Sequence, residues 1–294
     1  PVLLHFQCTS LLSSLLSSSH YHTLESMSVR VVPVPALDDN YMYLVIDTAT
    51  NHAGVVDPVD PEAIQAAAAA NGATITCILT THSHWDHAGG NIKMVEQVST
   101  LKTVYGGIGD DAAGVTHEVG EGDEFNIGET TVKVIFTPCH TPGHVCYFVD
   151  GKHVFTGDTL FISGCGNFNS GTAEQMTSAF DKLMGLPDET QVWVGHEYTG
   201  TNCRFACFVE PENQDVRDRL DWAAQQVSIH KGGQGTIPST IAQEKACNPF
   251  CRIDTVKITE FCGNCTDRSE RMRLVRKGKD DWGAAQRAAA AGKK

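Results

Sequence analysis

Residues Thr81–His87 read Thr-His-Ser-His-Trp-Asp-His, and this short segment constrains the chain more than any other. Side chains two positions apart on an extended segment point the same way, so His82, His84 and Asp86 can face one side. Asp86 and His87 are adjacent and must diverge, which fits two neighbouring metal centres better than one. The chain therefore needs a fold that brings further ligands to this segment.

Three further candidate ligands each follow an apolar run that we predict to be a strand. They are His140 in Thr-Pro-Cys-His, Asp158 in Gly-Asp-Thr and His196 in Gly-His-Glu. The carboxyl ends of strands are where α/β folds commonly place their chemistry, so we expect these side chains to converge. His144 lies four residues beyond His140, and we expect it to pack beside the ligands rather than to bind metal.

Five His and two Asp form a borderline ligand set that suits Zn²⁺ best and also Fe or Mn. Asp158 is the natural bridge, because a carboxylate can give one oxygen to each of two cations. Two carboxylates against two divalent cations leave a charge of about +2, which favours a bound hydroxide. Coordination lowers the pKa of water to about 7, so no Ser or Cys nucleophile is needed. We predict two divalent metal ions per chain, with Asp86 and Asp158 as the catalytic carboxylates.

Apolar runs alternating with turn residues predict an α/β chain. The predicted strands are 29–34 and 41–47 as an opening hairpin, then 53–56, 75–81, 131–136, 153–156 and 191–194. A helix is predicted from Asp60-Pro61 to Asn71-Gly72. After residue 197 we predict helices at 204–209 and 216–229, and strand alternation returns only at 255–258. The metal-binding domain is therefore expected at 28–197 and a helical C-terminal domain at 198–294.

Residues 1–27 are rich in serine and leucine and contain no Lys or Arg. We expect a leader or disordered extension there, and the alternatives are translated upstream sequence before a start at Met27 and a structured extension. The expected location is accordingly cytoplasmic or mitochondrial. Eleven scattered cysteines indicate a reducing compartment rather than a disulfide framework. A structural zinc site built from pairs such as Cys262/Cys265 is a lesser possibility.

The chain has 22 Lys and Arg against 35 Asp and Glu, a formal net charge of −13. This acidity argues against nucleic acid as a partner, since that requires a basic face. No apolar run reaches the length of a membrane-spanning helix, so no membrane partner is expected. We expect a monomer whose partner is a small molecule.

With these motifs the chain resembles the metallo-β-lactamase superfamily and, within it, glyoxalase II, the hydroxyacylglutathione hydrolases. The resemblance covers about residues 28–282, and its matching stretches are 37–47, 80–91, 155–166 and Asn248-Pro249-Phe250. It implies a four-layer αββα sandwich with a C-terminal helical domain that helps to bind a thiol substrate. It also implies that His82, His84 and His140 bind one metal ion. The implied ligands of a second ion are Asp86, His87 and His196, and Asp158 is implied to bridge the two ions.

The resemblance implies hydrolysis of S-D-lactoylglutathione to glutathione and D-lactate, which is methylglyoxal detoxification, by a metal-bridging hydroxide. The implied substrate-binding residues are Asn167, Phe168, Asn169, His196, Tyr198, Arg276 and Lys279. Residues 268–279 carry six cations and one acid, a local sum of +5, which we expect to attract the anionic substrate. Asn167 and Asn169 depart from the family, which commonly has Lys or Arg and Tyr there, so weaker thiol binding is expected.

Two other functions remain open on the sequence. The first is a persulfide dioxygenase that uses one iron, but such enzymes employ fewer ligands than this chain carries. The second is a two-metal hydrolase that acts on another thiol ester, an ester or a lactone. A binding module without catalysis is disfavoured, because no metal ligand is missing.

Overall fold

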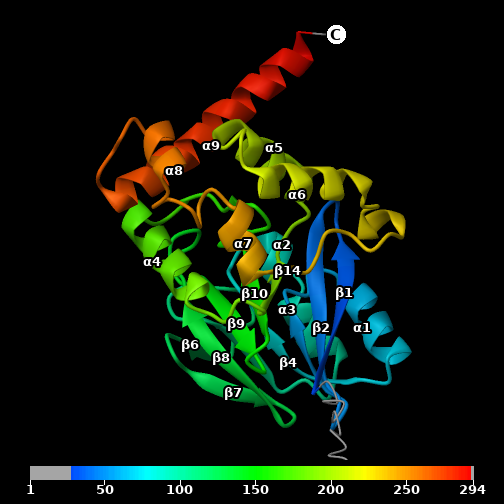
Figure 1. Cartoon of the computed structure of the whole chain (residues 1–294). Coiled ribbons are helices and arrows are strands. Elements are labelled where there is room, and N and C mark those ends of the chain that lie inside the picture. Colours follow the sequence, from blue (N-terminus) through cyan, green and yellow to red (C-terminus); the bar gives the residue numbers. More distant parts are fainter. Residues whose placement is uncertain (1–27, 293–294) are drawn as a thin grey trace, which may run out of the picture.

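Two six-stranded sheets face each other in the computed structural model, which describes residues 28–292 (Figure 1). The first sheet contains β1 (Val29–Ala36), β2 (Asn40–Asp47), β3 (His52–Val56), β4 (Thr74–Leu79), β5 (Thr103–Gly107) and β6 (His117–Val119), in that order. The second contains β14 (Ser239–Thr240), β13 (Gln191–Val194), β10 (His153–Gly157), β9 (Val145–Val149), β8 (Thr130–Phe136) and β7 (Glu124–Ile127). A small hairpin joins β11 (Leu160–Phe161) to β12 (Gly164–Cys165).

Strand β2 shows why the sheets are sandwiched between helices. All its residues are buried, and alternate side chains enter two different cores. Tyr43 and Val45 face the second sheet, whereas Leu44 and Ile46 face α1 (Pro61–Ala70) and α3 (Asn91–Gln97). Helix α4 (Ala173–Met184) covers the second sheet. The predicted four-layer αββα class is therefore confirmed.

The local signals in the first part of the chain agree with the structure. The opening hairpin pairs Val29 with Asp47 and Ala36 with Asn40. Asp60 caps α1 by accepting a hydrogen bond from the amide of Ala63 at 3.1 Å. The strands predicted up to residue 194 all appear, with boundaries displaced by at most two residues.

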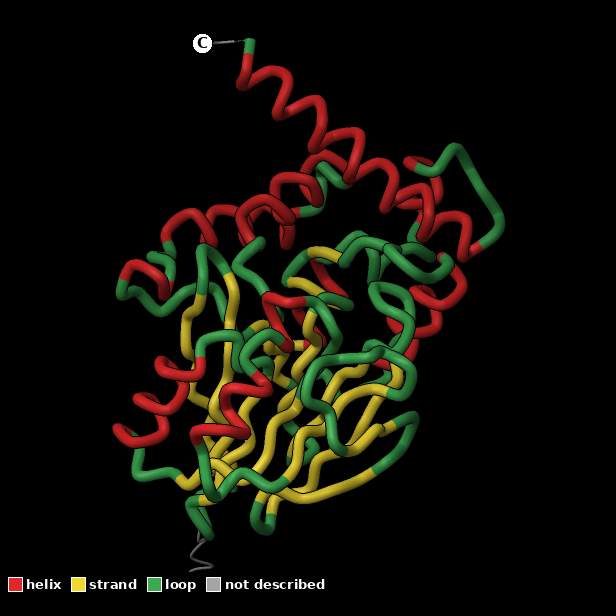
Figure 2. The backbone as a smooth tube through the Cα atoms, turned by 180° about the vertical axis from the view of Figure 1, so that it is seen from behind, coloured by secondary structure: helices red, strands yellow, loops and turns green. Residues whose placement is uncertain are grey.

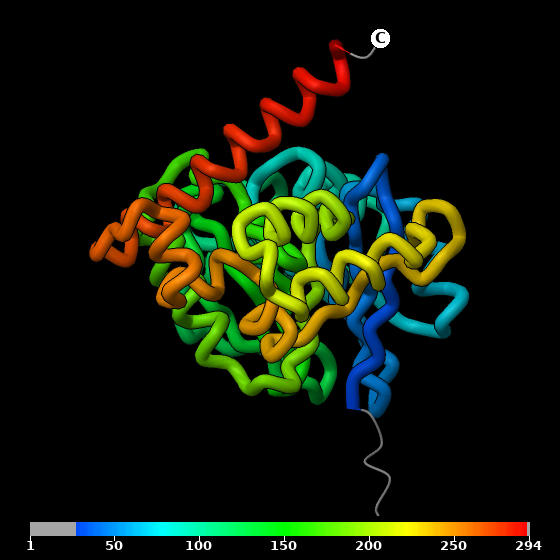
Figure 3. The backbone as a smooth tube through the Cα atoms, turned by 45° about the horizontal axis from the view of Figure 1, so that its top comes forward, coloured from blue at the N-terminus to red at the C-terminus, as the bar shows by residue number. Residues whose placement is uncertain are grey.

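Helices dominate after residue 197 and gather at one end of the two sheets (Figures 2 and 3). They are α5 (Thr199–Val209), α6 (Gln214–Gln225), the 3₁₀ helix η1 (Ile229–Lys231), α7 (Ile241–Cys247), α8 (Val256–Phe261) and α9 (Arg268–Ala291). The strand alternation predicted at 255–258 is wrong. This segment begins the helix α8, and the Thr255 side chain caps it by accepting a hydrogen bond from the backbone amide of Ile258. Threonine is a preferred residue at this capping position, because its oxygen satisfies a free amide at the start of a helix.

Some predictions fall outside what the structure tests. The predicted leader lies within residues 1–27, outside the described residues, and the domain limits at 27 and 197 stay predictions. Within residues 28–292, no helix is both long enough and apolar enough to cross a bilayer.

Candidate metal centre

The seven candidate ligands lie together at one end of the sandwich. Strand β10 is parallel to β13 and antiparallel to β9, and β9 is antiparallel to β8, so β8, β10 and β13 run in the same direction. The segments that follow their carboxyl ends carry His140, Asp158 and His196. The segment after β4 carries the remaining four and ends in α2 (Trp85–Ala88). The strand-end rule therefore predicts the correct place in the fold.

One group consists of three imidazoles. His84 Nδ1 lies 3.0 Å from His82 Nε2 and 3.1 Å from His140 Nε2. His82 and His140 are buried, and His84 is half-buried. Three ring nitrogens that face one point can donate their lone pairs to a single cation.

A second group contains Asp86, His87 and His196. The Nε2 atoms of the two histidines lie 3.2 Å apart. Asp86 Oδ2 lies 3.6 Å from His87 Nε2 and 3.4 Å from His196 Nε2. The expectation that Asp86 shares a side with His82 and His84 and diverges from His87 is wrong, because Trp85–Ala88 form the helix α2 rather than an extended segment. Asp86 and His87 contribute to one group, and His82 and His84 contribute to the other. This division is the one that the family resemblance implies.

Asp158 joins the two groups. Its Oδ1 lies 3.4 Å from the Nε2 atoms of His87 and His196, and its Oδ2 lies 3.4 Å from His140 Nε2. Asp158 Oδ1 is buried and has no hydrogen-bond partner among the described residues. A buried carboxylate oxygen without a donor is costly unless a cation balances it. The residues present therefore fit divalent metal ions.

The electrostatics differ between the groups. Burial, together with the neighbouring imidazoles, holds the pKa of His82 well below its ordinary value, so it is neutral and can bind metal. Burial would also lower the pKa of His196, but the nearby carboxylates of Asp158 and Asp86 raise it to about 11. Metal binding at the second group therefore has to release protons.

Three residues that sequence reasoning missed hold the ligands in place. Asp57 accepts hydrogen bonds from the backbone amide of Thr81 at 2.8 Å and from His87 Nδ1 at 2.9 Å. Asp39 accepts from the other histidine of the group, His196, at 2.8 Å. Asp57 follows the end of β3, so the strand-end rule would have found it; Asp39 lies in a segment that resembles only a turn.

The third missed residue is Asn40, whose amide donates to both the backbone oxygen and Oδ2 of Asp86 at 3.0 Å. Its own carbonyl, like that of Ala36, lies 3.1 Å from Nε2 of His230 in η1. Through this contact the C-terminal part of the chain supports the turn that holds the second group.

His144 lies beside the site without joining either group. Its Nε2 accepts a hydrogen bond from the backbone amide of Asp158 at 3.2 Å, so Nδ1 carries the proton and faces Thr137 Oγ1 at 2.9 Å. The ring stacks on His82 with centroids 5.0 Å apart. His144 thus orients the backbone of the residue that joins the two groups.

A cavity of about 400 Å³ opens beside the metal groups. Its wall includes His140, Asp158, Asn167, Tyr198, Arg276 and Lys279. The ring of Tyr198 stacks on His196 with centroids 4.8 Å apart. Phe168 and Asn169, which we expected to contact substrate, line a neighbouring cavity instead. The structure therefore separates the predicted substrate contacts into two places.

The expected positive patch at 268–279 is wrong as a free patch. Within α9, Arg273 pairs with Glu270, Arg276 with Asp280 and Lys277 with Asp281. The charge sum over residues 268–279 left out Asp280 and Asp281, which follow directly. Lys279 alone among these cations has no carboxylate partner in the described chain; it donates to Asn202 Oδ1. Burial and the charge of Arg276 lower its pKa from 10.5 to about 7.

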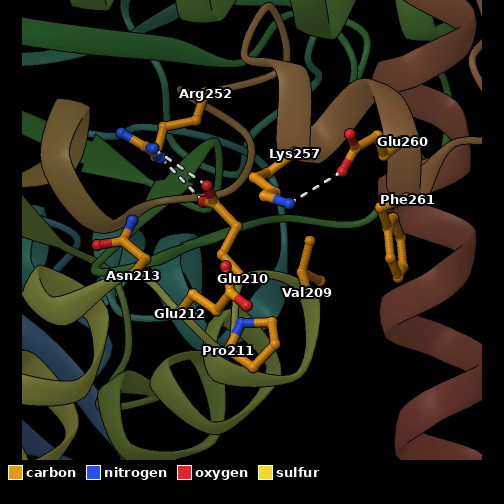
Figure 4. Close-up of a pocket in the computed structure, with 9 residues that line it drawn as sticks. All are labelled: Val209, Glu210, Pro211, Glu212, Asn213, Arg252, Lys257, Glu260 and Phe261. Atoms are coloured by element: carbon orange, nitrogen blue, oxygen red, sulfur yellow. Dashed lines mark hydrogen bonds and ion pairs between the residues drawn. The ribbon is translucent and has the colours of Figure 1, made fainter.

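The cysteines and a further cavity within residues 28–292 do not form a second metal site or an activated nucleophile. No cysteine belongs to a candidate metal group within residues 28–292, so nothing there supports a zinc site at Cys262/Cys265. Burial raises the pKa of Cys165, beside the metal cavity, to about 12, which keeps it a thiol. A separate cavity of about 490 Å³ between α5 and α8 is lined by the ion pair of Glu210 and Arg252, in which the buried carboxylate is balanced by the guanidinium (Figure 4).

An αββα sandwich with His and Asp residues at the strand ends defines the class of protein. A family model described as the metallo-beta-lactamase superfamily matches residues 37–196. A second model, described as hydroxyacylglutathione hydrolase C-terminus, matches residues 197–282. The chain is thus a member of the metallo-β-lactamase superfamily that binds divalent metal.

Relatives narrow the class. The chain is 48% identical to the cytoplasmic hydroxyacylglutathione hydrolase of Arabidopsis thaliana, over 86% of this chain and 99% of that one. It is 41% identical to a hydroxyacylglutathione hydrolase-like protein of Gallus gallus, over 87% and 90% of the two chains. The chain therefore belongs to the hydroxyacylglutathione hydrolase (glyoxalase II) family and is a metal-dependent thioester hydrolase, as predicted.

A solved structure supports the same architecture. The crystal structure of ETHE1 from Myxococcus xanthus matches with a TM-score of 0.60 and 27% identity, covering 85% of this chain and 90% of that chain.

Proposed function

We propose that the chain hydrolyses S-D-lactoylglutathione to glutathione and D-lactate, as a monomer with two divalent metal ions. Zinc is the first choice, and iron or manganese fit the same donors. The observation that carries this proposal is the position of Asp158, whose two carboxylate oxygens face different ligand groups beside the cavity of about 400 Å³. All seven candidate ligands come from one chain, which supports a monomeric site.

The ligands would form two sets, each of which would hold one metal ion. His82, His84 and His140 would hold one ion, and the second would be held by the other group: Asp86, His87 and His196. Asp158 would contact both. When bound, divalent ions would supply water of lowered pKa as the nucleophile and would stabilise negative charge on the thioester carbonyl oxygen.

The chain's own residues then orient the reactants. Asp57 and Asp39 fix the ring orientation and tautomer of His87 and His196 through their Nδ1 atoms. Lys279 lines the same cavity as His140 and Asp158 and can donate to a carboxylate of the thiol. The substrate's reactive carbonyl and its anionic end would thereby be held in one cavity.

A dioxygenase with one iron is the less supported alternative. Such a site needs a single ligand group, and the second group around Asp86 and His196 would then have no purpose. Those side chains also form hydrogen bonds to Asn40 and Asp39, which hold them toward the cation position. Their arrangement favours two ions and hydrolysis.

The test is a metal count combined with a substrate panel on the full chain. We expect two metal ions per chain and, among lactoyl thioesters of different thiols, efficient turnover of the glutathione ester. Chelation should abolish turnover, and added zinc should restore it. One iron per chain with sulfite release from glutathione persulfide, or an intact fold without metal, would overturn the proposal.

We propose a cytoplasmic or mitochondrial location. The name of the Arabidopsis relative supports the first. The leader that would decide between them is predicted within residues 1–27.

A further inference from the structure

A second cavity, of about 470 Å³, adjoins the metal cavity. It lies between the loop 167–169 and the face of α9 that carries Arg273, Arg276, Lys277 and Asp280. Asn167 and Arg276 line both cavities. The two spaces are therefore neighbours separated by these two side chains.

Arg276 has an unused donor at this boundary. The residue is only 8% exposed, and its Nη1 donates to the carbonyl of Cys165 at 2.8 Å while Nη2 pairs with Asp280. Its Nε is buried and has no partner among the described residues. A buried N–H without an acceptor is costly, and an arginine is suited to a carboxylate. A ligand carboxylate at the boundary would satisfy it.

The side chains that line the second cavity include more cations than acids. Residues 273, 276, 277 and 280 are three or four positions apart, so they share one face of α9. They supply three cations and one acid to the lining. Arg273 and Lys277 also pair with Glu270 and Asp281, but these pairs are exposed on both sides and such pairs contribute little. A bound anion can therefore replace those partners.

The loop opposite α9 contributes no cation of its own. Asn167 and Asn169 are exposed, and the loop is attached to the metal site because the Asn167 carbonyl accepts a hydrogen bond from His140 Nδ1 at 3.0 Å. Short amide side chains leave the second cavity open. The charge that meets a ligand there comes from the helix.

We propose that this second cavity binds an additional carboxylate at the carboxyl-terminal end of the thiol, so thiol peptides that end in an acidic residue bind better than glutathione. This deepens and rests on the proposed function. Lys279 receives the α-carboxylate of the terminal residue, and a side-chain carboxylate extends past Arg276 toward Arg273 and Lys277. The excess of two positive charges in the lining favours this dianionic end over the zwitterionic γ-glutamyl end.

The test measures binding without hydrolysis. Calorimetry on the metal-loaded full chain would compare the S-methyl thioethers of γ-Glu-Cys-Glu and of glutathione, which differ only at the terminal residue. We expect the acid-terminated peptide to bind at least about fivefold more tightly. The double variant Arg273→Gln/Lys277→Gln should lose this preference, while its affinity for S-methylglutathione changes less than about twofold.

The control variant Lys93→Gln/Lys245→Gln removes two other exposed, paired lysines and should keep the preference. Equal binding of both peptides by the parent would overturn the assignment. So would a loss of glutathione affinity in the double variant that disappears with S-methyl-cysteinylglycine, because the cavity would then hold the γ-glutamyl end. Hydrolysis of S-D-lactoylglutathione, measured in parallel, tests the proposed function separately.

Discussion

The metal groups and the cationic face of α9 differ in where their charged side chains find partners. In the metal centre, His87 and His196 each meet a carboxylate at one ring nitrogen while the other nitrogen faces the cation position. On α9, Arg273, Arg276 and Lys277 pair with exposed acids three or four residues away on the same helix. The first arrangement is rigid because it joins distant parts of the chain. The second can exchange partners, which suits a surface that must accept and release a substrate.

The variant Asp158→Ala is expected to have the largest effect on the metal centre. Both ligand groups lose their shared carboxylate, so we expect loss of at least one metal ion and a decrease in kcat of about 1000-fold or more. Metal analysis and steady-state kinetics measure the two effects. The control is Asp47→Ala, another buried aspartate, which accepts hydrogen bonds from Ala49 and Glu129. It should lower the free energy of unfolding by about 1–3 kcal/mol and keep the metal; wild-type turnover by Asp158→Ala would end the proposal.

Asp57→Asn tests whether the rigid partners matter. The amide keeps the shape of the side chain but places a donor against donors on Thr81 and His87. We expect metal affinity to fall about 10–100-fold, measured by competition with a chelator. Asp47→Asn, far from any ligand, should leave the affinity unchanged. An unchanged affinity in Asp57→Asn would mean that this partner does not orient the ligand.

The pH dependence of KM tests the substrate end of the cavity. The pKa of Lys279 is about 7, so the amine is charged below pH 7 and neutral well above it. An anionic thioester should therefore bind best near pH 6, with KM rising about tenfold by pH 9. Lys279→Arg stays charged and should give a flat profile at low KM, and Lys279→Met a flat profile at high KM. A parallel rise of KM in Lys279→Arg would assign the pH dependence to another group.

The smallest effect is expected from Asn167→Lys/Asn169→Tyr, which restores the side chains common in the family. Both positions face the second cavity and lie outside the ligand groups. KM for S-D-lactoylglutathione should fall about threefold or more, with kcat within twofold. Equal KM values for the parent and the double variant would refute a role for these asparagines in weakening thiol binding.

Local sequence patterns were sufficient to predict those parts of the fold and the site that depend on a single segment or on the end of a single strand. The cluster of His82, His84 and His87 and the apolar runs before His140 and His196 predicted an α/β chain with these side chains gathered at its strand ends. Asp57 obeys the same rule and was missed only because its segment carries no histidine. The strand expected at 255–258 failed because a short β-branched stretch also suits a capped helix turn.

The sequence by itself therefore determined an α/β chain and the residues that gather at its strand ends, because alternation and strand ends act over a few residues. The αββα sandwich was implied by the resemblance to the metallo-β-lactamase superfamily. Only the tertiary structure decided which groups are paired. It joined Asp39 to His196 and His230 to the turn before β2, over more than 150 residues in each case. It also neutralised most of the basic segment and left Lys279 as the unpaired cation, because burial and side-chain pairing depend on neighbours that no local pattern specifies.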